Sequence, residues 1–242
     1  MSYETNDLAG KVAVITGAST GIGAALARRL HEASVHVVLA SRSGTDLGLE
    51  GAIGRSCDVR DAAQVETLIE TAVSTFGRLD VLVANAGVGH YSGFLDTPRE
   101  HVAEMMETNA MGTINLYRAG LPHMIEANNG GDLITVSSQA GLHGFPGEAV
   151  YCASKFAQVG LTRAIDEEFR ALGIRAASVC PGGVHTEFAV GEGRGRSHDD
   201  PEVAAMMSAE DVSEVIYFTL TRPRTMRMME SGLQSMSEEL AG

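Results

Sequence analysis

The sequence has few cysteines, few basic residues and no long apolar run, and each shortage excludes a class of protein. Its three cysteines, Cys57, Cys152 and Cys180, are an odd number without the spacing of a metal site. Lysine and arginine number 18 against 31 aspartate and glutamate residues, a net charge of −13 that disfavours nucleic acid and anionic membranes as partners. No stretch approaches the roughly 18 apolar residues of a membrane-spanning helix, and the first residues lack the basic and apolar regions of a signal peptide. We therefore expect a reduced, cytoplasmic protein without metal, nucleic-acid or membrane partners.

A glycine-rich loop joins the first predicted strand to the first predicted helix. Residues 11–16 form a short apolar run and Ala24 opens a helical stretch, with Gly17, Gly21 and Gly23 between them. Glycines at these positions let the backbone approach a pyrophosphate, and the N-terminus of the following helix faces its negative charge. No Gly-Lys-Ser follows, which excludes a P-loop. A glycine turn without a cofactor is the alternative.

Strands and helices alternate along the rest of the chain. Further strands are predicted at 35–40, 53–57, 80–84, 133–136, 173–180 and 225–235, and helices at 61–76, 98–127, 149–172 and 211–220. About a dozen residues join the second and third strands, so the helix usual there is reduced to a turn. The alternation predicts an α/β fold of the Rossmann type: a doubly wound, mostly parallel seven-stranded sheet with helices on both faces, as a single domain over residues 1–242.

Tyr151 and Lys155 lie four residues apart in the predicted helix 149–172 and therefore share one face of it. A free tyrosine titrates near pH ~10, and a neighbouring ammonium group favours the phenolate and lowers that pKa. Such a tyrosine can act as an acid or a base near neutral pH. Ser138 follows the fifth strand, where its hydroxyl could hydrogen-bond a substrate oxygen. A surface tyrosine, a surface lysine and a loop serine are the alternative interpretation of the three residues alone.

Together these residues resemble the short-chain dehydrogenase/reductase family, and the resemblance covers nearly the whole chain. The loop spacing Gly-x-x-x-Gly-x-Gly matches the variant of that family. The resemblance implies that Tyr151 is the proton donor, that Ser138 orients the substrate carbonyl, and that Lys155 lowers the Tyr151 pKa and binds the nicotinamide ribose. It also implies that Asn109, in the long helix before the fifth strand, holds a water that links Lys155 to solvent; an exposed helix asparagine is the alternative.

The resemblance implies a nicotinamide cofactor, and the end of the second strand indicates NADP(H). Uncharged Ser41 stands where an acidic residue would bind the 2′-hydroxyl of NAD, and Arg42 could bind a 2′-phosphate. The resemblance also implies that Asp58 contacts the adenine; a helix N-cap is the alternative, and the two roles are compatible. An exposed loop arginine is the alternative for Arg42. The expected cofactor-binding residues are Gly17, Ser19, Thr20, Gly21, Ile22, Gly23, Ser41, Arg42, Asp58, Val59, Asn85, Ala86, Gly87, Tyr151, Lys155, Pro181, Gly182, Val184 and Thr186.

Aromatic and histidine side chains that follow the fourth, fifth and sixth strands are expected to meet the substrate. They are His90, Tyr91, His143, Phe145 and Phe188. Aromatic walls with a few polar tips suit a small, mostly apolar carbonyl compound. Residues 187–208 are predicted to form a substrate lid, with a disordered surface loop as the alternative.

The predicted activity is reversible hydride transfer between NADP(H) and a carbonyl or secondary alcohol, as in a ketoreductase or a 3-hydroxy acid dehydrogenase. Residues 208–223 resemble the branch of the family with NADP-dependent serine and 3-hydroxy acid dehydrogenases. Two alternatives are a non-catalytic NADP(H)-binding sensor or regulator, usually marked by a broken Ser-Tyr-Lys set, and an NADP-dependent epimerase or dehydratase, usually a longer chain. The resemblance also implies a homo-oligomer, a tetramer with two-fold symmetry.

Overall fold

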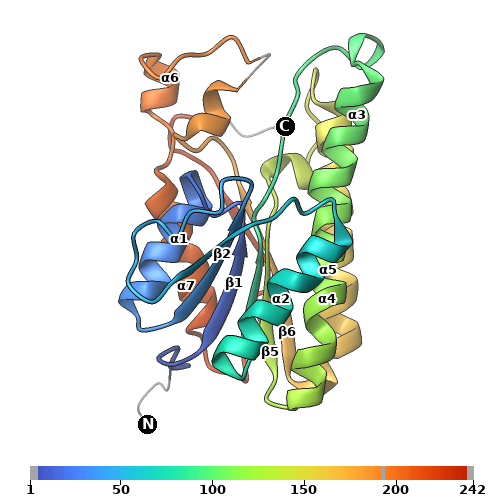
Figure 1. The fold of residues 1–242 in the computed structure, drawn as a ribbon. Coiled ribbons are helices and arrows are strands. Elements are labelled where there is room, and N and C mark those ends of the chain that lie inside the picture. The colour runs from blue at the N-terminus through green and yellow to red at the C-terminus, as the bar shows by residue number, and fades with distance from the viewer. Residues whose placement is uncertain (1–4, 192–193, 239–242) are drawn as a thin grey trace.

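Seven parallel strands form a central sheet in the computed structural model, which describes residues 5–191 and 194–238 (Figure 1). The strands are β1 (Val12–Thr16), β2 (His36–Ser41), β3 (Ile53–Ser56), β4 (Val81–Ala84), β5 (Gly131–Val136), β6 (Ile174–Pro181) and β7 (Glu230–Leu233). Their order across the sheet is β3-β2-β1-β4-β5-β6-β7, and every neighbouring pair is parallel. The doubly wound sheet predicted from the sequence is confirmed, and it is wholly rather than mostly parallel.

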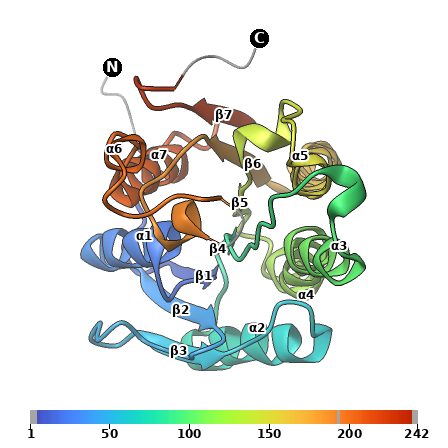
Figure 2. The same ribbon diagram turned by 90° about the horizontal axis from the view of Figure 1, so that it is seen from above.

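Helices cover both faces of this sheet. They are α1 (Gly21–Glu32), α2 (Ala62–Phe76), α3 (Arg99–Met105), α4 (Gly112–Ala127), α5 (Ala149–Phe169), α6 (Pro201–Ala204) and α7 (Ala209–Leu220). Figure 2 shows α1 and α7 on one side of the sheet and α2, α4 and α5 on the other. Among the described residues, no helix is both long and apolar enough to cross a membrane.

The two faces of each central strand pack into two separate hydrophobic clusters. In β1, Ala13 and Ile15 pack with side chains of α1 and α7, whereas Val12 and Val14 pack with those of α2 and α4. Successive side chains of a strand point to opposite faces, so a strand covered on both sides needs apolar residues at every position. This requirement explains why the central strands are continuous apolar runs in the sequence.

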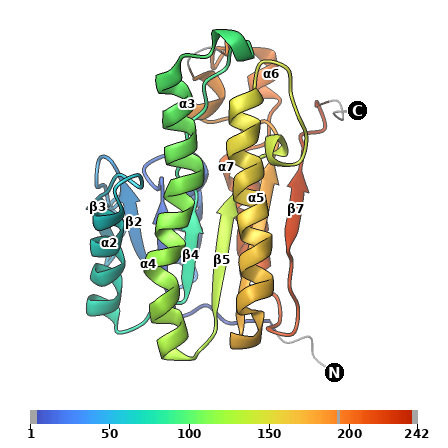
Figure 3. The same cartoon turned by 90° about the vertical axis from the view of Figure 1, so that its right-hand side faces the viewer.

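The helix predicted over 98–127 contains a π-helical turn, Met106–Met111, between α3 and α4. The two helices are stacked end to end (Figure 3). A π turn spans one residue more than an α-helical turn, and such turns are frequent at functional sites. This one contains Asn109, whose backbone carbonyl accepts a hydrogen bond of 2.7 Å from the Thr113 hydroxyl.

Two other predicted elements differ in extent from the observed ones, and one predicted connection agrees. The helix predicted over 149–172 is α-helical only to Phe169 and ends in a 3₁₀ turn, Arg170–Leu172. The last strand is shorter than the predicted 225–235. Residues 42–52, all of them described, form turns without a helix, as the short connection between β2 and β3 predicts.

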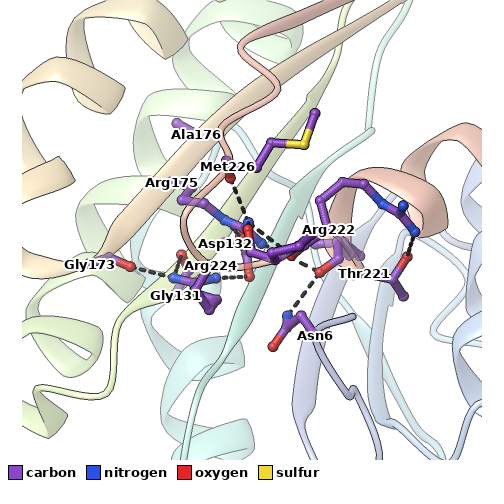
Figure 4. A network of polar contacts seen from close by, with 12 residues as sticks. Asn6, Gly131, Asp132, Gly173, Arg175, Ala176, Thr221, Arg222, Arg224 and Met226 are labelled. Atoms are coloured by element: carbon purple, nitrogen blue, oxygen red, sulfur yellow. Dashed lines mark hydrogen bonds and ion pairs between the residues drawn. The ribbon is translucent and has the colours of Figure 1, made fainter. Parts of the chain in front are cut away.

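A buried charge network fastens the amino ends of β5 and β6, at the edge of the sheet opposite the carboxyl ends (Figure 4). The Asp132 carboxylate accepts hydrogen bonds from Arg175 Nε at 2.7 Å and from Arg224 Nη1 at 2.6 Å. Arg175 Nη1 also donates to the carbonyl oxygen of Met226 at 2.8 Å. Asp132 and Arg175 are both buried, and breaking such a pair leaves an uncompensated buried charge. The network therefore holds the segment that leads into β7 against the sheet.

Candidate active site

A cavity of about 570 Å³ lies at the carboxyl ends of the strands, where a doubly wound sheet binds ligands. The loops after β1, β2, β3, β4, β5 and β6 contribute to its wall. The wall contains these predicted residues: Gly17, Ser19, Thr20, Gly21, Ile22, Ser41, Arg42, Asp58, Val59, Asn85, Ala86, Gly87, Ser138, Phe145, Tyr151, Lys155, Pro181, Gly182, Val184, Thr186 and Phe188. Residues predicted from seven separate stretches of sequence thus meet in one place. Gly23, His90, Tyr91, Asn109 and His143 are the predicted residues that do not line it.

Two glycines of this loop lie too close to neighbouring backbone atoms to carry a side chain. Gly17 has a φ of 63°, and a Cβ there would lie 2.7 Å from the Ala86 Cα atom. Gly23 lies behind the cavity, where a Cβ would be 2.4 Å from the Gly17 carbonyl oxygen. Gly17 therefore lets two loops meet, and Gly23 lets α1 pack against the loop that precedes it.

Thr16 and Asn85 hold the glycine loop and the loop after β4 together. The Thr16 hydroxyl accepts hydrogen bonds from the backbone amides of Asn85 and Ala86, both at 3.1 Å, and donates to the Val83 carbonyl at 3.1 Å. The Asn85 side-chain amide donates to the carbonyl oxygens of Thr16 and Gly17 at 2.9 and 3.0 Å. The sequence analysis missed Thr16, whose one signal was a polar residue at the end of a buried apolar run.

The N-terminus of α1 meets the cavity with its first amide groups free of a side-chain cap. Thr20, the N-cap residue, makes no side-chain capping hydrogen bond, and the first turn holds no acidic residue. Uncapped amides at a helix N-terminus carry partial positive charge and bind anions. The loop and the helix therefore fit the pyrophosphate of a dinucleotide cofactor.

Two arginines lie at the end of the cavity next to β2 and β3. Arg42 is exposed and forms no ion pair within the described ranges, whereas Arg60 pairs with Asp58 at 2.6 Å. The hydrogen bond from Arg60 lowers the pKa of Asp58. Ser41 is buried, and its hydroxyl accepts a hydrogen bond from the Gly44 amide at 3.1 Å. Arg60 was absent from the predicted set and adds a second positive charge at this end.

The predicted catalytic groups come from β5 and α5. Tyr151 and Lys155 lie one helical turn apart on α5, both buried, and Ser138 follows β5. The Lys155 ammonium donates to the Val136 carbonyl at 3.2 Å, and its nitrogen is 5.7 Å from the centroid of the Tyr151 ring. Ser138 caps the following 3₁₀ turn by accepting a hydrogen bond from the Ala140 amide at 3.1 Å.

Burial, rather than the lysine, dominates the titration of Tyr151. Burial raises its pKa above the ordinary value, and the hydrogen bond with Ser138 opposes that rise only in part. This direction is opposite to the lowered Tyr151 pKa expected from the sequence, because burial raises the pKa and the Lys155 ammonium bonds the Val136 carbonyl. Burial also lowers the pKa of Lys155, to about 8.

Asn109 is fully buried behind the cavity and joins its wall to α5. Its side-chain oxygen accepts from the Val88 amide at 2.8 Å, and its side-chain nitrogen donates to the Val88 carbonyl and the Ser154 hydroxyl, both at 2.9 Å. These bonds fix the stretch that follows Gly87. Gly87 itself lies close to Asn109: a Cβ there would be 3.3 Å from the Asn109 side-chain oxygen, a tight contact. Ser154 is a further buried partner that the sequence analysis missed.

The five residues predicted to contact substrate fall into two groups. Phe145 and Phe188 line the cavity, and the Phe188 and Tyr91 rings lie 6.0 and 5.7 Å from the Tyr151 ring. Tyr91 lines a smaller adjoining cavity. Neither His90 nor His143 lines either cavity.

His90 and His143 are not placed as the sequence suggested. The His90 ring stacks on His101 with centroids 3.8 Å apart, and its Nε2 atom bonds Glu104 at 2.8 Å. His143 lies on the exposed side of its loop. The order of the chain placed both residues after the correct strands, but local packing on α3 and the path of the loop turn them from the cavity.

The segment predicted as a lid supplies several residues of the cavity wall. Besides Phe188 these are Glu187, Ala189, Arg194, Arg196 and Met206. Residues 192 and 193 of this segment, like 1–4 and 239–242 of the predicted domain, lie outside the described residues. The arginines were not among the predicted site residues. In the ranges that the structure describes, no cluster of three or more His, Cys, Asp or Glu side chains could hold a metal ion.

The fold and the cavity together define an α/β enzyme of the dinucleotide-binding class. Residues 11–196 match the family model described as short chain dehydrogenase. The chain belongs to the short-chain dehydrogenase/reductase family. It is accordingly an oxidoreductase that acts on alcohol or carbonyl groups, and a nicotinamide cofactor is typical of the family.

Three relatives illustrate the similarity. Oxidoreductase UcpA from Salmonella typhimurium is 38% identical over 203 residues, which cover 81% of this chain and 77% of that protein. A short chain dehydrogenase from Mycobacterium paratuberculosis, solved bound to NAD, has a TM-score of 0.84 at 29% identity and covers 95% of this chain and 98% of its own. An alcohol dehydrogenase from the archaeon Thermococcus sibiricus, complexed with 5-hydroxy-NADP, has a TM-score of 0.85 at 28% identity and covers 96% of this chain and 99% of its own.

Proposed function

We propose that this protein is an NADP(H)-dependent oxidoreductase that interconverts a carbonyl group and a secondary alcohol of a small molecule. The observation that carries the proposal is the meeting of Ser138, Tyr151 and Lys155 in one cavity with the glycine loop and the uncapped end of α1. A binding protein without activity would need the cradle for the dinucleotide but not the three polar groups at its end.

The chain's own residues would bind the substrate oxygen and move one proton. A nicotinamide bound in the cavity would supply or accept the hydride at the reacting carbon. Tyr151 gives its proton to the substrate oxygen in reduction and takes one back in oxidation. Its burial and raised pKa keep the phenol protonated at neutral pH, which suits a donor. Ser138 donates a hydrogen bond to the same oxygen as that oxygen gains negative charge.

Lys155 and Asn109 would assist proton transfer by Tyr151. Lys155, with a pKa of about 8, still carries its charge at neutral pH, so it can bind the ribose hydroxyls and favour departure of the Tyr151 proton. Asn109 lies in the π-helical turn and bonds both Val88 and Ser154. We propose that this position lets it hold the water that returns protons from solvent to Lys155.

The preference for NADP(H) rests on charge. Arg42 and Arg60 both face the cavity next to Ser41, and neither Ser41 nor the residues beside it in β2 bear a negative charge that would repel a 2′-phosphate. Guanidinium groups form charge-assisted, often bidentate, bonds to phosphate. The carboxylate of Asp58 also lines this end of the cavity, and its ion pair with Arg60 offsets its charge.

Five further proposals concern the protein around the site. We infer that residues 1–242 act as one catalytic domain and that residues 187–208 close over the substrate, which Phe188 and Ala189 on the cavity wall support. A homotetramer would cover the apolar side chains exposed on the helices, among them Met111 and Phe156. Three free, buried cysteines support a cytoplasmic location. Residues 208–223 favour the serine and 3-hydroxy acid dehydrogenase branch.

A screen of ketones, keto acids and sugars with NADPH, followed by loss of its absorbance, tests the activity. We expect turnover of at least one carbonyl class by the unmodified protein and none by Tyr151→Phe. Tight NADPH binding without turnover of any class would instead support a sensor.

A further inference from the structure

Arg194 holds a positive charge beside the predicted reaction centre. Its guanidinium carbon lies 3.8 Å from the centroid of the Tyr91 ring and 5.5 Å from that of Phe188. The same two rings flank Tyr151, at 5.7 and 6.0 Å. Arg194 also lines both the main cavity and the adjoining smaller one, so it stands where the two meet. The two aromatic faces fix its position.

The hydrogen bonds of this guanidinium group are incomplete. Its Nη2 donates to the Tyr91 hydroxyl, but its buried Nε atom has no hydrogen-bond partner among the residues that the structure describes. No carboxylate of the described residues forms an ion pair with it, whereas Arg196 pairs with Glu202 at 3.7 Å. A buried donor left without an acceptor is unfavourable, so a ligand that supplies an oxygen here would bind strongly.

The charges around Arg194 favour a negatively charged ligand at this end. Arg196 adds a second guanidinium group to both cavities. Glu148 is the acidic side chain that lines the two cavities together with them. It is half-buried, and burial raises its pKa while the charges of Arg194 and Arg196 lower it. Arg196 pairs with Glu202 and burial weakens the acid Glu148, so the charge of Arg194 stays largely uncompensated in a chain whose net charge is −13.

We propose that Arg194 binds the carboxylate of the substrate, which makes the substrate a keto acid in reduction and a hydroxy acid in oxidation. This inference rests on the proposed function and specifies its substrate class. The planar fork of a guanidinium group fits a carboxylate and binds it through two parallel hydrogen bonds. Tyr91 and Phe188 would cover the carbons between the carboxylate and the carbonyl, which faces Tyr151 and Ser138. The mostly apolar substrate expected from the sequence thus gains an acidic end.

Matched acids and esters test the proposal. The probes are 3-oxobutanoate and 4-oxopentanoate, each compared with its methyl ester, in reduction by NADPH. We expect kcat/KM for at least one acid to exceed that of its ester about 10- to 150-fold, the range of hydrogen bonds to a charged group. Equal or better use of both esters overturns the proposal, and because the esters then turn over, the proposed oxidoreductase function stands.

Substitutions of Arg194 and Glu148 test which side chain causes the preference for the acid over its ester. Arg194→Met should abolish the preference for the acid, and Arg194→Lys should keep part of it because the charge remains without the fork. Glu148→Gln should lower KM for the acid, since it removes a competing negative charge. Arg170→Met, which removes an exposed arginine paired with Glu167 on the surface, is the matched control and should retain the preference. An unchanged preference in Arg194→Met contradicts the proposal.

A binding measurement separates this inference from the activity. Calorimetric titration of 4-oxopentanoate into the protein with NADP should show binding that Arg194→Met loses. If the acid binds in this way and no carbonyl compound is reduced, the proposed function fails and the carboxylate site stands. If neither the acid binds nor the acids outperform their esters, the carboxylate site fails. Circular dichroism checks that each variant is folded.

Discussion

The ammonium group of Lys155 lies 5.7 Å from the centroid of the Tyr151 ring and donates its hydrogen bond to the Val136 carbonyl instead of the phenol. The two side chains therefore share a face of α5 without direct contact between their polar atoms. Tyr151 keeps a raised pKa and stays protonated, while Lys155 carries a charge that burial makes easy to lose. In the mechanism that we propose, the tyrosine donates the proton and the lysine affects how easily that proton leaves.

Replacement of the phenol hydroxyl should remove the proton donor without disturbing the fold. We expect Tyr151→Phe to bind cofactor normally and to reduce kcat by at least about 100-fold, the lower range for acid–base catalysis. Tyr217→Phe is the matched control, because Tyr217 lies on α7, under the guanidinium group of Arg29 and away from the cavity. A near-normal kcat of Tyr151→Phe at neutral pH would contradict the assignment.

The buried Lys155 should leave a signature in the dependence of stability on pH. Burial lowers its pKa from 10.5 to about 8, so between these two pH values the unfolded chain binds more protons at this site than the folded chain. The free energy of unfolding contributed by Lys155 therefore rises with pH through this window. We expect the difference in stability between the unmodified protein and Lys155→Met to grow from pH 8 to pH 10.5, measured by urea unfolding. A difference in stability that stays constant or falls with pH would show that folding does not lower the pKa of Lys155.

The hydroxyl of Thr16 should matter for both stability and cofactor binding. Thr16→Val keeps the shape but leaves the amides of Asn85 and Ala86 without their acceptor. We expect a loss of about 1–3 kcal/mol in the free energy of unfolding and a higher Kd for NADPH, because the two loops of the cavity lose their shared anchor. Thr71→Val, on the exposed face of α2, is the control and should change neither. Cofactor affinity unchanged in Thr16→Val would show that the anchor does not position the loop.

The charge network at the amino ends of the strands should affect stability alone. Asp132→Asn leaves Arg175 buried without its partner, and the loss of one member of such a pair costs about 3–5 kcal/mol. KM and kcat should stay unchanged in the folded variant, since the network lies at the edge of the sheet opposite the cavity. Glu167→Gln, in an exposed ion pair, should cost less than about 1 kcal/mol. A large change in KM for Asp132→Asn would mean that the network also positions the site.

The sequence predicted the parts of the molecule that depend on local pattern. Continuous apolar runs located the strands, and a spacing of four placed Tyr151 and Lys155 on one helical face. The glycine spacing located the loop that precedes α1. The parallel order of the strands brings these residues together at the carboxyl ends of the strands, where they line one cavity.

The sequence could not predict features that depend on contacts between distant segments. The bond between Arg194 and Tyr91 joins residues 103 positions apart, and nothing in either stretch indicates the other. His90 follows the correct strand, but its ring bonds Glu104 and stacks on His101, and it does not line the cavity. The pKa of Tyr151 was also misjudged, because the extent of its burial depends on the whole surrounding cavity rather than on the spacing to Lys155.

Cofactor choice should depend on Ser41 and Arg42. The exposed Arg42 lines the cavity beside the buried Ser41, and one or two bonds to a 2′-phosphate at about 1.5–3 kcal/mol each, discounted for exposure, predict a 10- to 1,000-fold preference for NADPH in kcat/KM. The double change Ser41→Asp, Arg42→Ala should invert this preference, since it removes a cation and adds a charge that repels the phosphate and binds the 2′-hydroxyl of NADH. Arg55→Ala, an exposed arginine of β3 that is not part of the cavity wall, should leave the preference unchanged. The measurement is kcat/KM for both cofactors with one carbonyl substrate. Equal or better use of NADH by the unmodified protein would show that Arg42 is an ordinary surface arginine and that the cavity accepts NAD.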